Sequence, residues 1–201
     1  MDKKEIILET ALALFNNYDT KTITTNHIAK EAGVSPGNLY YHYKNKEEII
    51  YELYKQMMQK IGFLSAPLPA SLCEMNTYCR YVANVWWKYR FLRKELLFLM
   101  RRDPLLQQAV IKDNKAQYEK LLELIKHLVT NGCIEKKAMQ MHQFIAQTIM
   151  LYSQFWTPFL TIMGEKEDEA AALRITQKIK KILQPYLTQK AIANLQQCKG
   201  V

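Results

Sequence analysis

The sequence predicts an all-α protein, and three observations carry that prediction. Apolar residues recur at helical spacing along most of the chain, whereas no stretch shows the convincing alternation of a strand. Only six glycines and six prolines occur among 201 residues, too few for a turn-rich β architecture. Hydrophobic residues make up 49% of the chain, which is ample for the core of one large or two small domains.

The first helix is expected over residues 3–17. Ile7, Ala11 and Phe15 recur there at helical spacing and give one apolar face. The N-terminal residues lead directly into this helix, so no signal peptide is visible and we expect a cytoplasmic protein.

Residues 24–48 predict two short helices that meet at a tight turn. Gly33 stands where the first of them ends, since glycine enters the left-handed conformation without a Cβ penalty. Ser35 is a good N-cap and Pro36 suits the first helical position, so the second helix is expected over residues 36–43. Two short helices around a glycine-bearing turn indicate a helix-turn-helix motif.

The residues of this motif resemble a known family. Thr24-Thr25, Ile28-Ala29, Ala32 to Ser35 and Leu39 to Glu48 are similar to the DNA-binding domain of the TetR/AcrR family of bacterial transcription regulators. The resemblance covers about the first quarter of the chain. It implies a DNA-binding domain in residues 1–47 and a ligand-binding and dimerisation domain in residues 48–201, connected by the helix over residues 46–63.

Position in the motif divides the expected DNA contacts into two sets. The side chains or backbone expected at base edges are those of Asn26, Pro36, Gly37, Asn38, Tyr40 and Tyr41. The phosphate contacts are expected from Thr25, Tyr40, His42 and Lys46, and Ser35 joins the same surface. The alternative for Tyr40 and Tyr43 is a role as core aromatics, which we favour for Tyr43.

Further helices follow, separated by glycine, proline and polar residues. They are expected over residues 46–63, 71–89, 90–102, 104–130, 136–163 and 165–184, with one more short helix after residue 186 as an alternative to a frayed tail. Residues 138–164 carry no charge and are long enough to span a membrane. We reject that interpretation because Pro158 interrupts the segment and Gln143, Gln147 and Gln154 line one side, which suits an interface between proteins.

The net charge of +9 is weak evidence for DNA binding because of where it lies. Residues 1–60 hold eight basic and eight acidic side chains, whereas the remainder holds 20 basic and 11 acidic ones. The DNA-binding prediction therefore depends on the motif. A basic group near the middle of the chain could receive an anionic ligand, although a solvated face is the commoner explanation. It consists of Lys88, Arg90, Arg93, Lys94, Arg101 and Arg102.

The resemblance also implies a pocket for a small molecule in the C-terminal half, which is rich in aromatic residues. The residues expected to line it are Trp86, Trp87, Phe91, Tyr118, Phe144, Gln147, Tyr152 and Phe155. The alternative for each of them is a place in a core or a dimer interface.

No catalytic or metal-binding pattern is found, so we expect neither an enzyme nor a cofactor nor a metal site. Four cysteines without a CxxC pair are expected as reduced thiols.

Together these observations predict a homodimeric, ligand-responsive repressor that binds an inverted-repeat operator in double-stranded DNA. Its dimer interface is expected from the helices over residues 136–163 and 165–184. An activator or a partner-regulated protein is the first alternative, and a helical enzyme domain with a DNA-binding head is the second.

Overall fold

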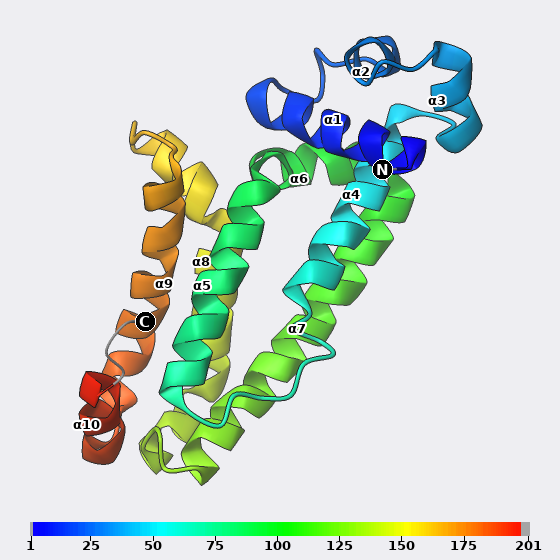
Figure 1. Ribbon diagram of the computed structural model, residues 1–201. Helices are drawn as coiled ribbons and strands as arrows, with labels where there is room; N and C mark the ends of the chain where they lie inside the picture. Colours follow the sequence, from blue (N-terminus) through cyan, green and yellow to red (C-terminus); the bar gives the residue numbers. More distant parts are fainter. Residues whose placement is uncertain (1, 198–201) are drawn as a thin grey trace. The chain divides into compact units, whose positions relative to one another are not determined.

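The computed structural model describes residues 2–197, with side chains to residue 195, and these residues are mostly helical (Figure 1). The α-helices are α1 (Lys3–Asn17), α2 (Thr25–Glu31), α3 (Pro36–His42), α4 (Lys46–Ile61), α5 (Leu72–Lys88), α6 (Arg90–Arg102), α7 (Pro104–Thr130), α8 (His142–Ile162), α9 (Glu169–Leu183) and α10 (Gln189–Gln197). Within the described residues the β structure is limited to an isolated bridge between Ile134 and Leu187. The all-α prediction is confirmed.

The observed helix ends refine the predicted ones by a few residues. Helix α4 stops at Ile61, two residues early, because Gly62 takes the left-handed conformation at φ 62°. The segment predicted as one helix over residues 136–163 begins instead with a 3₁₀ turn, η1 (Lys136–Gln140). Helix α9 begins at Glu169 rather than 165, because the Asp168 carboxylate caps it by accepting from the Ala171 N–H at 2.8 Å.

The described residues divide into two compact units. The first lies within Met1–Lys60 and Lys88–Val110, and the second within Ile61–Trp87 and Ile111–Val201. Packing therefore places most of α4 and all of α6 with the helix-turn-helix residues. The predicted functional boundary after residue 47 follows chain order and stays a prediction.

The core of the first unit is built around α1. Ile7, Ala11 and Phe15 are buried along one side of that helix, as the spacing predicted. Tyr43 is also buried, which agrees with the core role favoured for it, and burial raises the pKa of its phenol. Phe91 of α6 lies against Phe15 with ring centroids 5.1 Å apart.

The core of the second unit is centred on α8 and α9, which lie side by side. The α8 residues Ile145, Ala146, Ile149, Trp156 and Leu160 are buried, together with Ala171, Ile175, Ile179 and Leu183 of α9. The buried Trp156 indole donates to the Ala171 carbonyl at 2.9 Å, so its N–H group is satisfied inside the core.

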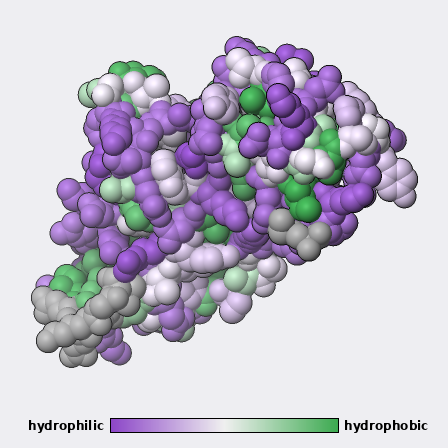
Figure 2. Space-filling model, turned by 45° about the horizontal axis from the view of Figure 1, so that its top comes forward, coloured by the Kyte–Doolittle hydropathy of each residue, from purple (hydrophilic) through white to green (hydrophobic). Residues whose placement is uncertain are grey.

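Among the described residues, no helix is both long and apolar enough to cross a membrane. On the face seen in Figure 2, hydrophilic residues dominate and hydrophobic ones form small separate patches. In the same residues, no group of three or more His, Cys, Asp and Glu side chains is placed to hold a metal ion.

The cysteines differ from one another. Cys79 and Cys133 are free thiols, and burial raises the pKa of Cys79 to about 11, so it is a neutral core residue near pH 7. The prediction of reduced thiols stays a prediction at Cys73. Cys198 lies outside the described residues.

Candidate DNA interface

The turn between α2 and α3 has the geometry that its sequence predicts. Gly33 adopts φ +65°, a conformation that other residues rarely take. Ser35 caps α3 by accepting from the Asn38 N–H at 3.1 Å, and Pro36 occupies the first turn, where a missing N–H has no cost. The start of α3 is therefore fixed by local chemistry.

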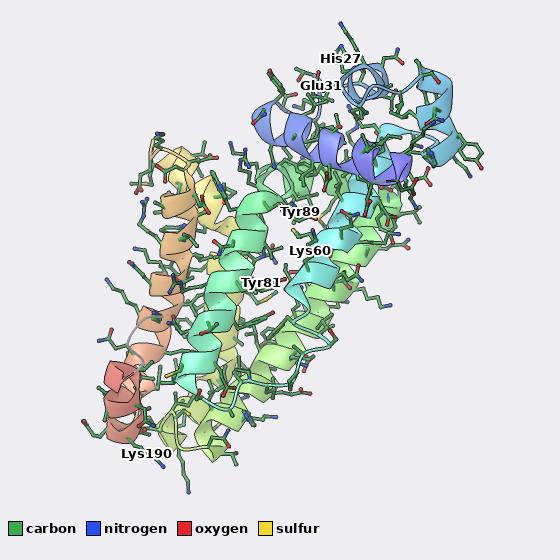
Figure 3. All side chains as sticks on the ribbon, viewed as in Figure 1. His27, Glu31, Lys60, Tyr81, Tyr89 and Lys190 are labelled. Carbon is green, nitrogen blue, oxygen red and sulfur yellow. The ribbon has the colours of Figure 1, made fainter. Side chains whose placement is uncertain are left out.

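The start of α2 is fixed by a reciprocal cap. The Thr24 hydroxyl accepts from the His27 N–H at 3.2 Å, and His27 Nδ1 accepts from the Thr24 N–H at 3.4 Å. This is a capping box in which histidine replaces the usual Glu or Gln. His27, labelled on α2 in Figure 3, thus has a role in local structure that the sequence reasoning missed.

A hydrogen bond joins the two helices on their outer side. Thr25 Oγ1 and the Tyr40 hydroxyl are 2.9 Å apart, and the Tyr40 side chain is 48% exposed. Tyr40 is therefore an accessible residue and not the core aromatic of the alternative interpretation. The pair presents two hydroxyl groups together, which suits a phosphate oxygen.

Most of the residues predicted at base edges lie on the surface. Asn26, Pro36, Gly37 and Tyr41 are exposed, as is Ser35, and at 84% Tyr41 is the most exposed large hydrophobic residue in the described part of the chain. The half-buried His42 ring meets the Tyr41 ring edge to face with centroids 5.1 Å apart. Most of these residues belong to α3 or its N-cap, and Asn26 lies in the first turn of α2. They therefore belong to the same helix-turn-helix surface.

Asn38 differs from the other residues of this set. Its Oδ1 atom is buried and has no hydrogen-bond partner among the described residues. A paired contact with adenine needs both the oxygen and the nitrogen of the amide at the groove. The side chain must therefore turn outward before it can read a base.

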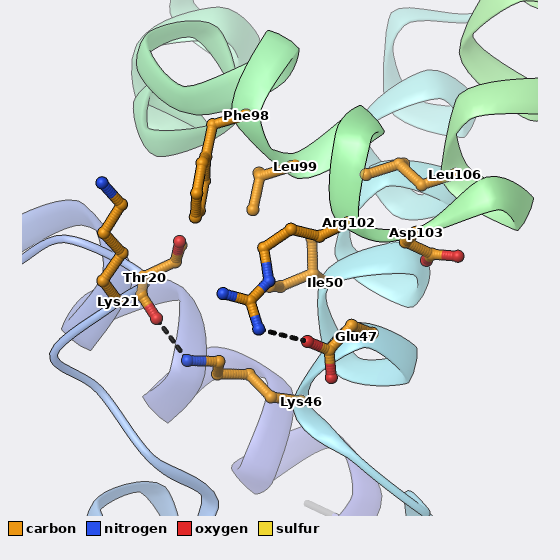
Figure 4. Close-up of a pocket in the computed structure, with 10 residues that line it drawn as sticks. All are labelled: Thr20, Lys21, Lys46, Glu47, Ile50, Phe98, Leu99, Arg102, Asp103 and Leu106. Atoms are coloured by element: carbon orange, nitrogen blue, oxygen red, sulfur yellow. Dashed lines mark hydrogen bonds and ion pairs between the residues drawn. The ribbon is translucent and has the colours of Figure 1, made fainter.

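Lys46 also faces inward. Its ammonium group donates to the carbonyl oxygens of Thr20 and, at 2.8 Å, Ile23, and burial lowers its pKa (Figure 4). These contacts give Lys46 a structural role in fixing the loop before α2. Its predicted phosphate contact stays a prediction.

The residues predicted to bind a ligand are divided between the two units. Phe91 is buried in the first unit, whereas Trp86 and Tyr118 pack partly buried against the core of the second. Trp87 is half-buried. Four others lie exposed on the surface of α8 and do not line a cavity there. They are Phe144, Gln147, Tyr152 and Phe155.

The basic group does not form one solvated face. Arg93 is buried and its pKa is lowered by burial to about 10, whereas Lys94 beside it is exposed. Arg102 lies over the Phe98 ring at 5.6 Å and is 3.9 Å from the Glu47 carboxylate. The members of the group thus differ in burial and in their contacts, which does not favour a shared anion site.

Two short helices joined by a capped glycine turn, with polar and aromatic residues on the outer side, define a helix-turn-helix protein. The family model described as "Bacterial regulatory proteins, tetR family" matches residues 7–53. A second family model, TetR, described as "Bacterial transcriptional repressor", matches residues 53–195. The second match alone spans more than half of the chain. The chain belongs to the TetR family.

Individual relatives agree with this assignment. The HTH-type transcriptional regulator YhgD of Bacillus subtilis is 39% identical over 64 residues, which cover 30% of this chain and 34% of YhgD. The chain thus aligns with about a third of that relative. The HTH-type transcriptional regulator AcrR of Shigella flexneri is 26% identical over 149 residues, 69% of this chain and 67% of AcrR.

A solved structure matches along nearly the whole chain. A TetR-family transcriptional regulator from Marinobacter aquaeolei has a TM-score of 0.86 at 28% identity and covers 98% of this chain and 99% of its own. SmeT, the repressor of the Stenotrophomonas maltophilia multidrug efflux pump SmeDEF, has a TM-score of 0.64 at 18% identity over 94% of this chain and 92% of its own. At 18% identity, the similarity to SmeT shows a shared fold.

Proposed function

We propose that the chain is a homodimeric, sequence-specific DNA-binding repressor. The observation that carries this proposal is the exposed surface of α3, where Tyr41 and Gly37 lie open beside the Thr25–Tyr40 hydroxyl pair. A short helix with open polar and aromatic groups fits the major groove, and flanking hydroxyls suit its phosphates. The TetR family models support the same function.

The second part of the proposal is a dimer formed through α8 and α9. The outer side of α8 carries an apolar stripe at helical spacing, made of Phe144, Leu151, Phe155, Phe159 and Ile162. The exposed fractions of these five side chains run from 45% to 82%. Monomeric proteins rarely expose such a continuous stripe, so a second copy of the chain is the occupant we propose.

A dimer explains an inverted-repeat operator and its release. Two recognition helices grip two half-sites only when they lie about 34 Å apart or a multiple of it. A small molecule that binds the released arrangement more tightly shifts the population away from DNA. We propose that this effector binds in the second unit, where the buried Asn76 Oδ1 has no hydrogen-bond partner among the described residues. A ligand N–H or O–H group would satisfy it.

Fluorescence anisotropy with DNA flanking the gene, at two salt concentrations and against random DNA, tests the proposal. We expect tight, sequence-dependent binding that weakens steeply with salt. Tyr41→Ala should weaken specific binding about fivefold or more, because one base contact is worth roughly 1–3 kcal/mol. Thermal stability should be unchanged, since the ring is 84% exposed.

Tyr81→Ala is the matched control, because Tyr81 is another partly open tyrosine but lies on α5, at 48% exposure. It should bind the operator like the wild type. Equal losses in both variants, or equal weak binding of the wild type to flanking and random DNA at every salt concentration, would contradict the proposed interface.

A further inference from the structure

Helix α6 presents one side to the rest of the first unit. Four residues of this side recur every three or four positions, and each contacts a residue earlier in the chain; they are Phe91, Glu95, Phe98 and Arg102. At the start of this side, the Phe91 N–H donates to the Asn16 side-chain oxygen at 3.2 Å, just beyond its ring contact with Phe15. No pattern in the sequence assigns α6 a part in DNA binding.

The central contact of this side joins Glu95 to Thr20 in the loop between α1 and α2. The Thr20 hydroxyl donates to Glu95 Oε2 at 2.6 Å, and the Thr20 N–H lies 3.1 Å and 3.3 Å from the two carboxylate oxygens. Thr20 is only 2% exposed. Short hydrogen bonds to an ionised carboxylate are about twice as strong as neutral ones, and partial burial protects these from water.

The opposite side of the same loop is held by α4. The Lys46 ammonium donates to the carbonyl oxygens of Thr20 and Ile23, as Figure 4 shows for Thr20. Glu95 also acts on Lys46 electrostatically by favouring its charged form. Glu95 of α6 thus accepts hydrogen bonds from the N–H and hydroxyl groups of the loop, and Lys46 of α4 donates hydrogen bonds to its carbonyl oxygens.

What this loop positions is the DNA interface itself. The loop ends at Thr24, the N-cap of α2, and the next residue is Thr25, which shares a hydrogen bond with Tyr40. A shift of Thr20 therefore moves the start of α2 and the hydroxyl pair that suits a phosphate. The path from Glu95 to that pair runs through five residues of backbone.

We propose that Glu95 of α6 is a positioning residue for DNA binding and acts through Thr20. The proposal rests on the proposed DNA-binding function and adds that operator affinity is set in part from a helix outside the motif. Loss of the Glu95–Thr20 hydrogen bonds should loosen the loop over residues 18–24 and weaken specific binding, while random DNA, held by charge, is bound as before.

The test uses full-length variants and a duplex selected from a random DNA pool by the wild-type protein. Thr20→Val keeps the side-chain shape and removes the hydroxyl, and Glu95→Gln removes the charge. Both should weaken binding to the selected duplex about tenfold, as expected for one hydrogen bond to a charged group. Thr20→Ser keeps the hydroxyl and should stay near wild type. Glu123→Gln, an exposed carboxylate on α7, is the control.

Amide hydrogen exchange without DNA separates a local effect on the loop from a general loss of stability. Exchange should rise in residues 18–24 of Thr20→Val and Glu95→Gln and stay unchanged in the rest of α1 and in the second unit. Wild-type affinity in both variants, unchanged loop exchange, or a uniform rise across the chain would overturn the positioning role. A wild-type protein that selects no sequence would instead refute the proposed function, and the role with it.

Discussion

Gly33 and Gly37 lie on either side of Ser35, the N-cap of α3. At these two positions the backbone conformation, and not the available space, decides whether a side chain is tolerated. An added Cβ would meet nothing within 4 Å at either position. The two glycines differ because Gly33 has φ +65°, whereas Gly37 lies in the first turn of a regular helix. A side chain is therefore strained at the first position and free of strain at the second.

This difference gives a paired prediction. Gly33→Ala should lower the free energy of unfolding by about 1–2 kcal/mol, the cost of a left-handed residue with a Cβ. Gly37→Ala should leave it unchanged or raise it by about 0.5 kcal/mol, since alanine restricts the unfolded chain. Urea unfolding of both variants measures the two values. Equal destabilisation by both would show that crowding, and not φ, controls this turn.

Individual helices are held in place by side chains that reach across to backbone carbonyls. Lys120 of α7 donates to the Leu64 carbonyl at 3.1 Å and the Ala66 carbonyl at 2.8 Å. Tyr78 of α5 donates to the Ile61 carbonyl at 3.0 Å. The residues that follow α4 are thus tied to the second unit by its own helices.

Lys120→Met should free the segment over residues 62–70 while it keeps the apolar stem of the side chain. We expect a loss of about 1–2 kcal/mol in unfolding free energy, because the ammonium group makes two hydrogen bonds, partly exposed to water. Hydrogen exchange should rise in residues 62–70. Lys115→Met, an exposed lysine of the same helix, is the control and should change neither quantity. Unchanged exchange in residues 62–70 would show that the Lys120 hydrogen bonds do not hold this segment.

Helix ends and turns that depend on neighbouring residues could be predicted from the sequence. Gly33, Ser35 and Pro36 determine the turn with no help from distant residues, so the motif could be read in advance. Glu95 and Thr20 lie 75 positions apart, and no local pattern links them. Lys46 was predicted to face DNA from its place in the motif, but its inward orientation depends on carbonyl groups 23 and 26 positions away.

For the whole molecule, the apolar stripe on α8 matters most, because in the dimer proposed above DNA binding depends on protein concentration. Ile162→Glu should leave the protomer folded, since that side chain is 82% exposed in the single chain. It should raise the dimer Kd by about 30-fold or more, because a charge left without a partner in an interface costs at least ~2 kcal/mol. Analytical ultracentrifugation measures the dimer Kd, and operator affinity should fall with it.

Leu105→Glu provides the matched control, because Leu105 is a similarly open apolar residue, at 66% exposure, on α7. It should leave the dimer Kd unchanged. Dissociation of the Leu105 variant, or an intact Ile162 variant, would place the interface elsewhere.

The first compact unit is discontinuous in sequence, and that constrains how such a protein can be recombined. Residues 88–110 belong to it although 27 residues of the other unit come before them. A DNA-binding head exchanged at residue 47 or 60 would leave Asn16 and Thr20 to face a foreign α6 that need not carry a carboxylate opposite Thr20. A head that changes its operator by recombination therefore keeps its loop geometry only when the segment containing Glu95 travels with it.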